Sequence, residues 1–302
     1  MNQKELCCLG HITLDKVVTP RQTVHMPGGT AFYFAHAMRQ IEGVDFSLVT
    51  AVAQSEMNVV EDLRSKGVDV LALPSEHSVC FANIYGENQN ERKQRVTAKA
   101  ASFNCAQLAD VNAEIFHLGS LLADDFPLET VKYLSTKGKV SVDSQGFLRE
   151  VRGEEVFAID WKEKNDFLPY VYFLKVDEHE MEVLTGFTDV RKAAVRLNEW
   201  GVKEVIITLG DRGSVIYDGH IFYRIPAYRP KEIVDATGCG DTYMTGYLYQ
   251  KALGKSIEEC GCFAAAMSSI KIEAMGPFKG TKEKIQDYID HAEALYGPEK
   301  LL

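Results

Sequence analysis

The sequence lacks the cysteine pattern of a disulfide framework or of a zinc site. Its seven cysteines are an odd number, and the close pairs are adjacent or one residue apart, so no Cys-x-x-Cys motif occurs. A disulfide scaffold or a zinc module therefore has no support. We expect reduced, mostly buried thiols in a cytosolic protein. They are Cys7, Cys8, Cys80, Cys105, Cys239, Cys260 and Cys262.

Long hydrophobic runs and clustered positive charge are also missing. No apolar run approaches the roughly 18 residues of a membrane-spanning helix, and no apolar segment follows a basic start. The 33 Lys and Arg stand against 43 Asp and Glu, which gives a formal net charge of −10 with both signs spread along the chain. We expect a soluble, cytoplasmic protein that binds neither nucleic acid nor a membrane. An anionic ligand would need local dipoles and a metal ion to hold it.

Two common nucleotide-binding motifs are incomplete. Leu253-Gly-Lys-Ser256 resembles the end of a P-loop, but Tyr249 stands where that motif needs its first glycine. Gly238-Cys-Gly240 resembles the start of a dinucleotide fingerprint, but Tyr243 stands where the third glycine belongs. A P-loop NTPase and a Rossmann oxidoreductase both lose their main support.

What the sequence does contain is a regular alternation of short apolar runs and amphipathic stretches. This alternation predicts an α/β fold with a mostly parallel sheet and helices on both faces. Ligands of such sheets bind outside the carboxyl ends of the strands. The expected strands are 6–9, 46–52, 68–73, 115–118, 140–142, 172–176 and 204–208, and the expected helices are 31–39, 58–66, 126–136, one from 178, 191–200 and one from 242.

Two segments alternate polar and apolar residues instead. They are residues 16–25 and 78–99, and the second has a polar turn at 86–91 between its two halves. Such alternation indicates strands with one solvated face. We predict a small β lid over the ligand site, although an ordinary surface hairpin fits the second segment too. With no repeat or linker-like stretch, residues 1–302 are expected to form one domain with this lid.

The most informative stretch is Asp235-Ala-Thr-Gly-Cys-Gly-Asp241. Glycines 238 and 240 flank a cysteine, a carboxylate follows, and a helix-like run begins at Thr242. Backbone N–H groups at a helix N-terminus form an anion site. A carboxylate beside an anion site can take a proton from a hydroxyl while the N–H groups hold a phosphoryl group. The stretch therefore favours phosphoryl transfer to an alcohol, although a glycine-bearing turn with an acidic cap has a similar sequence.

This stretch and five others, in the same order along the chain, make the sequence similar to the ribokinase-like (PfkB) carbohydrate kinases. That resemblance implies a three-layer ribokinase-like fold with a β-strand lid, and an ATP-dependent kinase. The matching segments are Gly10-His-Ile-Thr-Leu-Asp15, Gly28-Gly29-Thr-Ala-Phe, Lys175-Val-Asp-Glu-His-Glu180, Thr208-Leu-Gly210-Asp-Arg-Gly213, Asp235 to Asp241, and Phe263-Ala-Ala-Ala-Met-Ser-Ser269 with Gly276 beyond it.

By this resemblance, Asp241 is the base, and the N–H groups of Gly238, Cys239 and Gly240 hold the transferring phosphate. Asp15, Gly28 and Gly29 contact a polyol, with Tyr33, Phe81 and Asn83 shaping its pocket. Thr208, Gly210, Gly213, Ala265 and Gly276 lie on the nucleotide side. Asp177 and Glu180 suit Mg²⁺ through its waters, although acidic residues also favour a helix start. Asp235 and Thr237 could give oxygens to a monovalent cation such as K⁺.

Some positions depart from the family pattern. Tyr33 and Ala265 stand where asparagine is common, Asp177 stands where asparagine is usual, and Ala53-Gln-Ser-Glu56 replaces a Gly-x-Asp-Asp element. The acceptor half is thus the less typical half. Residues 142–149 and the aromatic residues after Gly29 are more like the myo-inositol kinase branch.

Several questions stay open at this point. The acceptor is a sugar, a cyclitol or a nucleoside, and a non-catalytic nucleotide or sugar sensor on the same scaffold is the main alternative to an enzyme. A phosphomethylpyrimidine or pyridoxal kinase relative fits less well. A homodimer through the lid edge is a further expectation, because exposed strand edges invite pairing.

Overall fold

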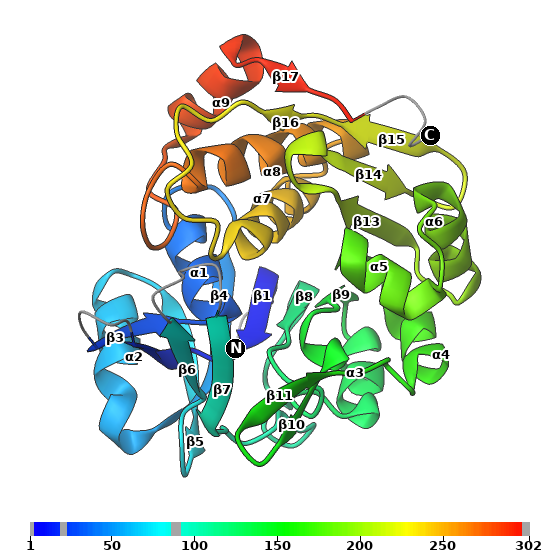
Figure 1. The fold of residues 1–302 in the computed structure, drawn as a ribbon. Helices are drawn as coiled ribbons and strands as arrows, with labels where there is room; N and C mark the ends of the chain where they lie inside the picture. The colour runs from blue at the N-terminus through cyan, green and yellow to red at the C-terminus, as the bar shows by residue number, and fades with distance from the viewer. Residues whose placement is uncertain (1–2, 19–22, 86–91, 298–302) are drawn as a thin grey trace.

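The computed structural model describes residues 3–18, 23–85 and 92–297, and within them a nine-stranded sheet forms the centre of the molecule (Figure 1). In spatial order its strands are β15 (Phe222–Ile225), β14 (Ser214–Tyr217), β13 (Glu204–Thr208), β12 (Phe173–Asp177), β9 (Lys139–Asp143), β8 (Ala113–Gly119), β1 (Lys4–Gly10), β4 (Phe46–Ala53) and β5 (Asp69–Ser75). Neighbouring strands pair in parallel from β13 to β5, while β14 and β15 are antiparallel. The predicted α/β class and mostly parallel sheet are confirmed.

Helices cover both faces of this sheet and so make three layers. Figure 1 shows α7 and α8, in yellow and orange, on one side of β13 and β14, and α5 and α6, in green, on the other. Each face has its own apolar core. The first face carries α1 (Thr30–Met38), α2 (Met57–Ser65), α7 (Cys239–Ala252), α8 (Ile257–Lys271) and α9 (Lys282–His291). The second carries α3 (Leu128–Ser135), α4 (Lys164–Phe167), α5 (Glu178–Thr185) and α6 (Val190–Glu199).

Local sequence signals explain where several helices begin. Ser256 and Glu259 form a capping box at the start of α8, and the side chains of Asp189 and Thr281 cap α6 and α9. The helix predicted from Thr242 begins earlier, at Cys239, with Gly238 as its N-cap. The boundary moves because Gly238 adopts a left-handed conformation that turns the chain directly into the helix.

The segments predicted to form a lid belong to a second, six-stranded sheet. Its spatial order is β10 (Arg149–Arg152), β11 (Glu155–Ala158), β7 (Arg92–Ala98), β6 (Cys80–Tyr85), β2 (Thr13–Val18) and β3 (Thr23–Gly28). Both predicted segments contain strands, β2 and β3 in the first and β6 and β7 in the second, while residues 19–22 and the turn predicted at 86–91 lie outside the described residues. That this sheet acts as a lid stays a prediction. The short hairpin β10–β11 was not predicted. Within the described chain β3 and β10 are the two edges of this sheet, and a homodimer through the lid stays a prediction.

The topology brings the functional segments to one place. Strand β2 of the lid follows the carboxyl end of β1, and β10 follows that of β9. Because β1, β9, β12 and β13 all run parallel, their carboxyl ends share one edge of the sheet, beside the lid. A small third sheet pairs β16 (Ala227–Tyr228) with β17 (Ala294–Leu295). Among the described helices, none combines the length and apolar character needed to cross a bilayer.

Candidate active site

A cleft of about 1150 Å³ lies at this edge of the sheet, between the lid, the loop before α7, and α8. Most of the predicted site residues line it. Those residues are Asp15, Gly29, Tyr33, Phe81, Asn83, Asp177, Thr208, Gly210, Gly213, Asp235, Thr237, Gly238, Cys239, Gly240, Asp241 and Ala265. Gly28, Glu180 and Gly276 are not part of this lining. The sequence did not single out Thr30, Gln94, Asp143, Gln145, Arg149, Lys175 and Ser268, which line the cleft as well.

The turn before α7, residues 235–240, has the geometry of an anion site. Gly238 has φ 76° and ψ 9°, and the helix begins directly after it. The first N–H groups of a helix have no partner within the helix, so those of Gly240 and Asp241 face the open end of α7. Cys239 differs from its predicted role, because its N–H donates to the carbonyl of Ala236 at 3.1 Å. The N–H of Gly240 is therefore better placed than that of Cys239 to donate to a bound phosphoryl group.

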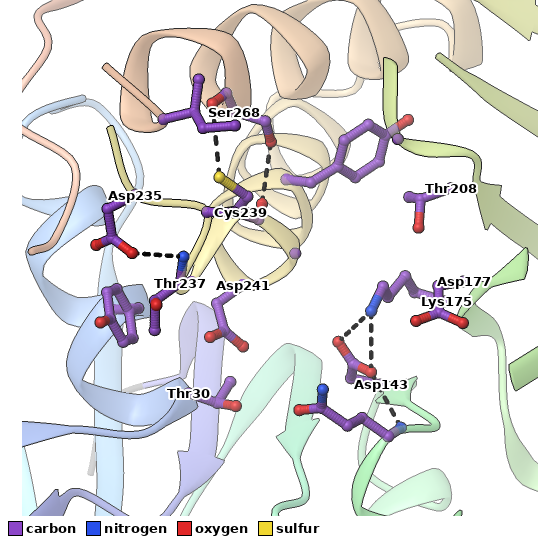
Figure 2. A pocket seen from close by; sticks show the side chains of 18 of the residues that line it. Thr30, Asp143, Lys175, Asp177, Thr208, Asp235, Thr237, Cys239, Asp241 and Ser268 are labelled. Carbon is purple, nitrogen blue, oxygen red and sulfur yellow. Dashed lines mark hydrogen bonds and ion pairs between the residues drawn. The ribbon is translucent and has the colours of Figure 1, made fainter. Parts of the chain in front are cut away.

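Helix α8 holds this turn from behind. The Ser268 hydroxyl donates to the carbonyl of Cys239 at 3.0 Å, and the Cys239 thiol lies 3.8 Å from the carbonyl of Ser268 (Figure 2). Burial raises the pKa of Cys239 to about 11, so its thiol stays protonated near neutral pH. Cys239 thus serves the turn by packing and hydrogen bonding rather than as a thiolate nucleophile.

Asp241 lies in the first turn of α7 and lines the cleft, with Thr30 beside its carboxylate (Figure 2). Burial is the main cause that raises the pKa of Asp241 to about 6, and the negative charge of Asp143 adds to it. The Thr30 hydrogen bond and the positive charges of Lys175 and Arg149 act in the opposite direction. A carboxylate with a pKa near 6 is ionised at neutral pH and is a better proton acceptor than an exposed one.

A buried ion pair stands across the cleft from Asp241 (Figure 2). Lys175, on β12, places its Nζ 3.0 Å from Oδ2 of Asp143, which ends β9. Burial lowers the pKa of Lys175, but the charges of Asp143 and Glu180 outweigh it, and the pKa is raised above its usual range. A methyl group added at Gly240 would lie 3.3 Å from this Nζ, so a fixed positive charge faces the anion turn.

Asp177 and Glu180 form a capping box at the start of α5. Oδ1 of Asp177 accepts from the N–H of Glu180 at 2.7 Å, and Oε2 of Glu180 accepts from the N–H of Asp177 at 2.8 Å. Glu180 also accepts from the Ser144 hydroxyl at 3.0 Å and is only 6% exposed. We predicted that both carboxylates face the nucleotide. The structure puts only Asp177 on the cleft, because the side chain of Glu180 turns back to the backbone.

The lid end of the cleft is mixed in polarity. Asp15 lies on β2, and a methyl group at Gly28 would be 3.0 Å from its Oδ2, so the glycine leaves room for this carboxylate. Phe81 and Asn83 are both buried on β6. The side chain of Gln94 on β7 donates to the Asn83 amide oxygen at 3.0 Å, which fixes the orientation of that amide. The carboxylate and the amide can hydrogen-bond the hydroxyl groups of a polyhydroxy ligand, and the aromatic ring can pack against a less polar face of that ligand.

The opposite end of the cleft has a more apolar lining. Thr208 ends β13 and donates to the carbonyl of Val176 at 3.4 Å, while Gly210 and Gly213 shape the loop that follows. Ala265 on α8 faces this space. Gly276 contacts the anion turn instead, because its N–H donates to Oδ2 of Asp235 at 3.3 Å. The apolar lining here includes Pro226, Tyr228, Tyr243, Ile272, Met275 and Leu295.

Comparison with known proteins agrees with this geometry. The chain is 29% identical over 272 residues to a cytidine kinase of Thermococcus kodakarensis, covering 85% of this chain and 91% of that one. It is 25% identical over 293 residues to a nucleoside kinase of Methanocaldococcus jannaschii, covering 90% and 92%. Its fold superposes with a TM-score of 0.80 on a pyrophosphate-dependent kinase of the ribokinase family, solved with a pyrophosphate analog and myo-inositol, at 27% identity over 93% of this chain and 99% of that one.

The family model described as pfkB family carbohydrate kinase matches residues 3–284, which include the nine-stranded sheet, the six-stranded sheet and all of the cleft lining except Leu295. The expected ribokinase-like fold is thereby confirmed. The chain belongs to the pfkB family of carbohydrate kinases.

Proposed function

We propose that this kinase transfers the γ-phosphoryl group of ATP to a hydroxyl group of a small sugar or polyol, with Asp241 as the base. The observation that carries the proposal is the position of Asp241, in the first turn of α7, beside the anion turn. Asp15 lines the same cleft on the lid side and Thr208 on the opposite side. An acceptor hydroxyl and a phosphoryl donor can therefore meet at this carboxylate.

In this mechanism Asp241 accepts the proton of the attacking hydroxyl. Phosphoryl transfer passes through a loose transition state, so catalysis depends mostly on positioning and on stabilising charge. The N-terminus of α7, with the N–H of Gly240, supplies hydrogen-bond donors for the oxygens that carry this charge. Lys175 adds a fixed positive charge on the opposite side, held in place by Asp143.

The donor end supports ATP rather than pyrophosphate alone. An adenine ring needs an apolar slot, and Tyr228, Tyr243 and Met275 provide apolar surface beyond the anion turn. Pyrophosphate has no apolar group that could pack against that surface. The chain is also similar to a pyrophosphate-dependent kinase, so pyrophosphate is the alternative donor that the test below includes.

Asp177 is the residue that we propose for Mg²⁺. Mg²⁺ keeps several waters and binds proteins through one or two carboxylates together with substrate phosphates. The cleft fits this mode, because Asp177 lines it at the end of β12 with Glu178 next to it, and the described residues contain no group of three or more His, Cys, Asp or Glu side chains that could hold a metal ion. When bound, Mg²⁺ neutralises charge on the phosphate oxygens. Glu180 holds Asp177 in place through the capping box.

A nucleoside is the second candidate acceptor. Two relatives that align with most of this chain are a cytidine kinase and a nucleoside kinase. At the lid end, Phe81 and Met26 give apolar surface for a base, while Asp15 and Asn83 give acceptors for ribose hydroxyls. A cyclitol would use the same polar groups but not the apolar surface.

A panel of acceptors tests the proposal. ADP or phosphate release is measured with ATP and Mg²⁺, and in parallel with pyrophosphate, across pentoses, hexoses, myo-inositol, 2-keto-3-deoxygluconate and nucleosides. We expect ATP-dependent turnover with one acceptor class. Turnover with pyrophosphate alone would refute ATP as the donor, and a response to nucleosides only would replace the sugar or polyol assignment.

The pH dependence of kcat/KM follows from the pKa of Asp241. The base acts only when ionised, and its raised pKa of about 6 means that acid protonates it just below neutrality. We expect kcat/KM to be level above pH 7 and to fall about tenfold per pH unit below the pKa. A profile that stays level down to pH 5 would contradict a base in this environment.

Removing the carboxylate of Asp15 is expected to weaken use of the acceptor and not of ATP. Hydrogen bonds to a charged group contribute about 1.5–3 kcal/mol, so Asp15→Ala should raise the acceptor KM by about 10- to 100-fold. Lys16→Ala is the matched control, because consecutive residues of a strand point to opposite faces and Lys16 is exposed. Steady-state kinetics with each substrate varied in turn gives both KM values. An unchanged acceptor KM in Asp15→Ala would place the acceptor elsewhere.

A further inference from the structure

A buried lysine lies beneath the anion turn. Lys271, the last residue of α8, is 2% exposed. Its Nζ donates to the backbone carbonyl of Asp235 at 2.7 Å and to Oδ2 of the same residue at 3.0 Å. One ammonium group thus binds the main chain and the side chain of the first residue of the turn.

The surroundings of this ammonium are those of a cation site. A helix C-terminus carries a partial negative charge, and Lys271 sits at that end of α8. Burying an unpaired ammonium is very unfavourable, so the paired carboxylate of Asp235 is what permits it. Burial raises the pKa of Asp235. Hydrogen bonds from Thr237 and Lys271 lower it by more, so the pKa lies below its usual range.

Hydrogen bonds of Asp235 hold the anion turn. Its Oδ1 accepts from the N–H of Thr237 at 2.9 Å, and its own N–H donates to the carbonyl of Ile272 at 3.1 Å. Three residues after Asp235 the chain reaches Gly238, whose left-handed conformation starts α7. A shift of Asp235 would therefore move the N–H groups that face the phosphoryl group.

We propose that Lys271 is the resident cation of this kinase, a positioning residue that holds the anion turn and makes a monovalent metal ion unnecessary there. The sequence led us to expect a monovalent cation on Asp235 and Thr237. In the structure the Lys271 ammonium is already hydrogen-bonded to the carbonyl and carboxylate oxygens of Asp235. An ammonium group and K⁺ are similar in size, so the two would compete for the same oxygens.

Two sets of measurements test this proposal on the full-length protein. The first is the melting temperature in KCl, NH₄Cl and tetramethylammonium chloride at matched ionic strength, which requires no acceptor. We expect no difference among the salts for the wild type. Lys271→Ala opens the site, so K⁺ and NH₄⁺ should raise its melting temperature by about 3 °C over tetramethylammonium, as expected for binding of a weak ligand.

The second measurement is turnover in the same salts. The inference concerns the kinase activity proposed above, and the melting experiment is independent of it. We expect wild-type kcat to be the same in all three salts, and Lys271→Ala to lose about 100-fold in tetramethylammonium, as for the loss of one stabilising donor. K⁺ or NH₄⁺ should bind in the vacated site and raise the kcat of Lys271→Ala about tenfold over its value in tetramethylammonium. Lys271→Met, which fills the space without a charge, should lose turnover and show no rescue by any salt.

Lys251→Ala is the matched control. Its ammonium also pairs with a buried carboxylate, that of Glu204 at 3.0 Å, but near the other end of α7. It should lower stability without creating any response to K⁺ or NH₄⁺. Activation of the wild type by K⁺ would overturn the proposal, as would a Lys271→Ala variant that keeps its turnover and gains no response in either measurement. If neither Lys271 variant folds, the salt dependence of wild-type turnover alone decides.

Discussion

Replacing Asp241 by asparagine is expected to lower kcat by about 10³-fold, the middle of the range for loss of a positioned general base. Asparagine has nearly the same shape, so the turn and the Thr30 contact should stay in place. It cannot accept the proton of the acceptor hydroxyl. ATP binding should change by less than about twofold, because the substitution removes a group that acts mainly in the transition state.

Rapid-quench kinetics of product formation together with equilibrium titration of ATP separate the two effects. Asp110→Asn, which changes an exposed carboxylate outside the cleft, is the control and should match the wild type. An Asp241→Asn variant with near-normal kcat would remove Asp241 from the role of base. Loss of ATP binding with an intact fold would instead give the carboxylate a part in holding the donor.

Gly238→Ala should also have a large effect, a loss of about 100-fold in kcat. Gly238 has φ 76°, where an L-residue is strained by about 1–2 kcal/mol. Its added methyl group would also lie 2.3 Å from Cδ1 of Tyr33, a ring that is itself 5% exposed and cannot move away freely. The turn must therefore shift, and a displacement of about 1 Å at a reacting group is enough for a loss of about 10².

Gly254→Ala separates the backbone strain from the contact with the ring. Gly254 follows the other end of α7 with φ 72°, and a methyl group there would meet nothing within 4 Å. Both variants carry the backbone strain, but Gly238→Ala should lose more stability in chemical denaturation because of its clash with the Tyr33 ring, and only Gly238→Ala should lose turnover. Equal turnover in the two variants would show that the position of this turn does not limit catalysis.

Much of the fold could be predicted because its signals are local. Continuous β-branched and apolar runs such as residues 204–208 have few alternatives to a buried parallel strand, and β13 spans those residues. The hairpin β10–β11 was missed because its two strands are short and mostly exposed, and it is stabilised by pairing with β7 rather than by its own pattern. The start of α7 was placed three residues late, because a left-handed glycine can serve as an N-cap without any side-chain signal.

The candidate site was predictable where its residues share a motif and not where they meet through folding. Residues 235–241 form one turn, so their sequence shows the anion site. Asp143 and Lys175 are 32 positions apart, and only the pairing of β9 with β12 brings them together. A charged residue inside or at the end of an apolar strand was the available signal for both. The position of Lys271 in the sequence does not indicate its buried ion pair, because a lysine at a helix end is common on protein surfaces.

The measurement that tests the central claim most directly follows the γ-phosphoryl group itself. ATP labelled in its γ-phosphoryl group is incubated with Mg²⁺, the acceptor found in the panel, and either wild-type protein or Asp241→Asn. Our account predicts that the label appears in a phosphate monoester of the acceptor, in equal amount to the ADP formed, and about 10³-fold more slowly with Asp241→Asn than with the wild type. It would be contradicted if the label were released as inorganic phosphate, or stayed in ATP that the protein demonstrably binds.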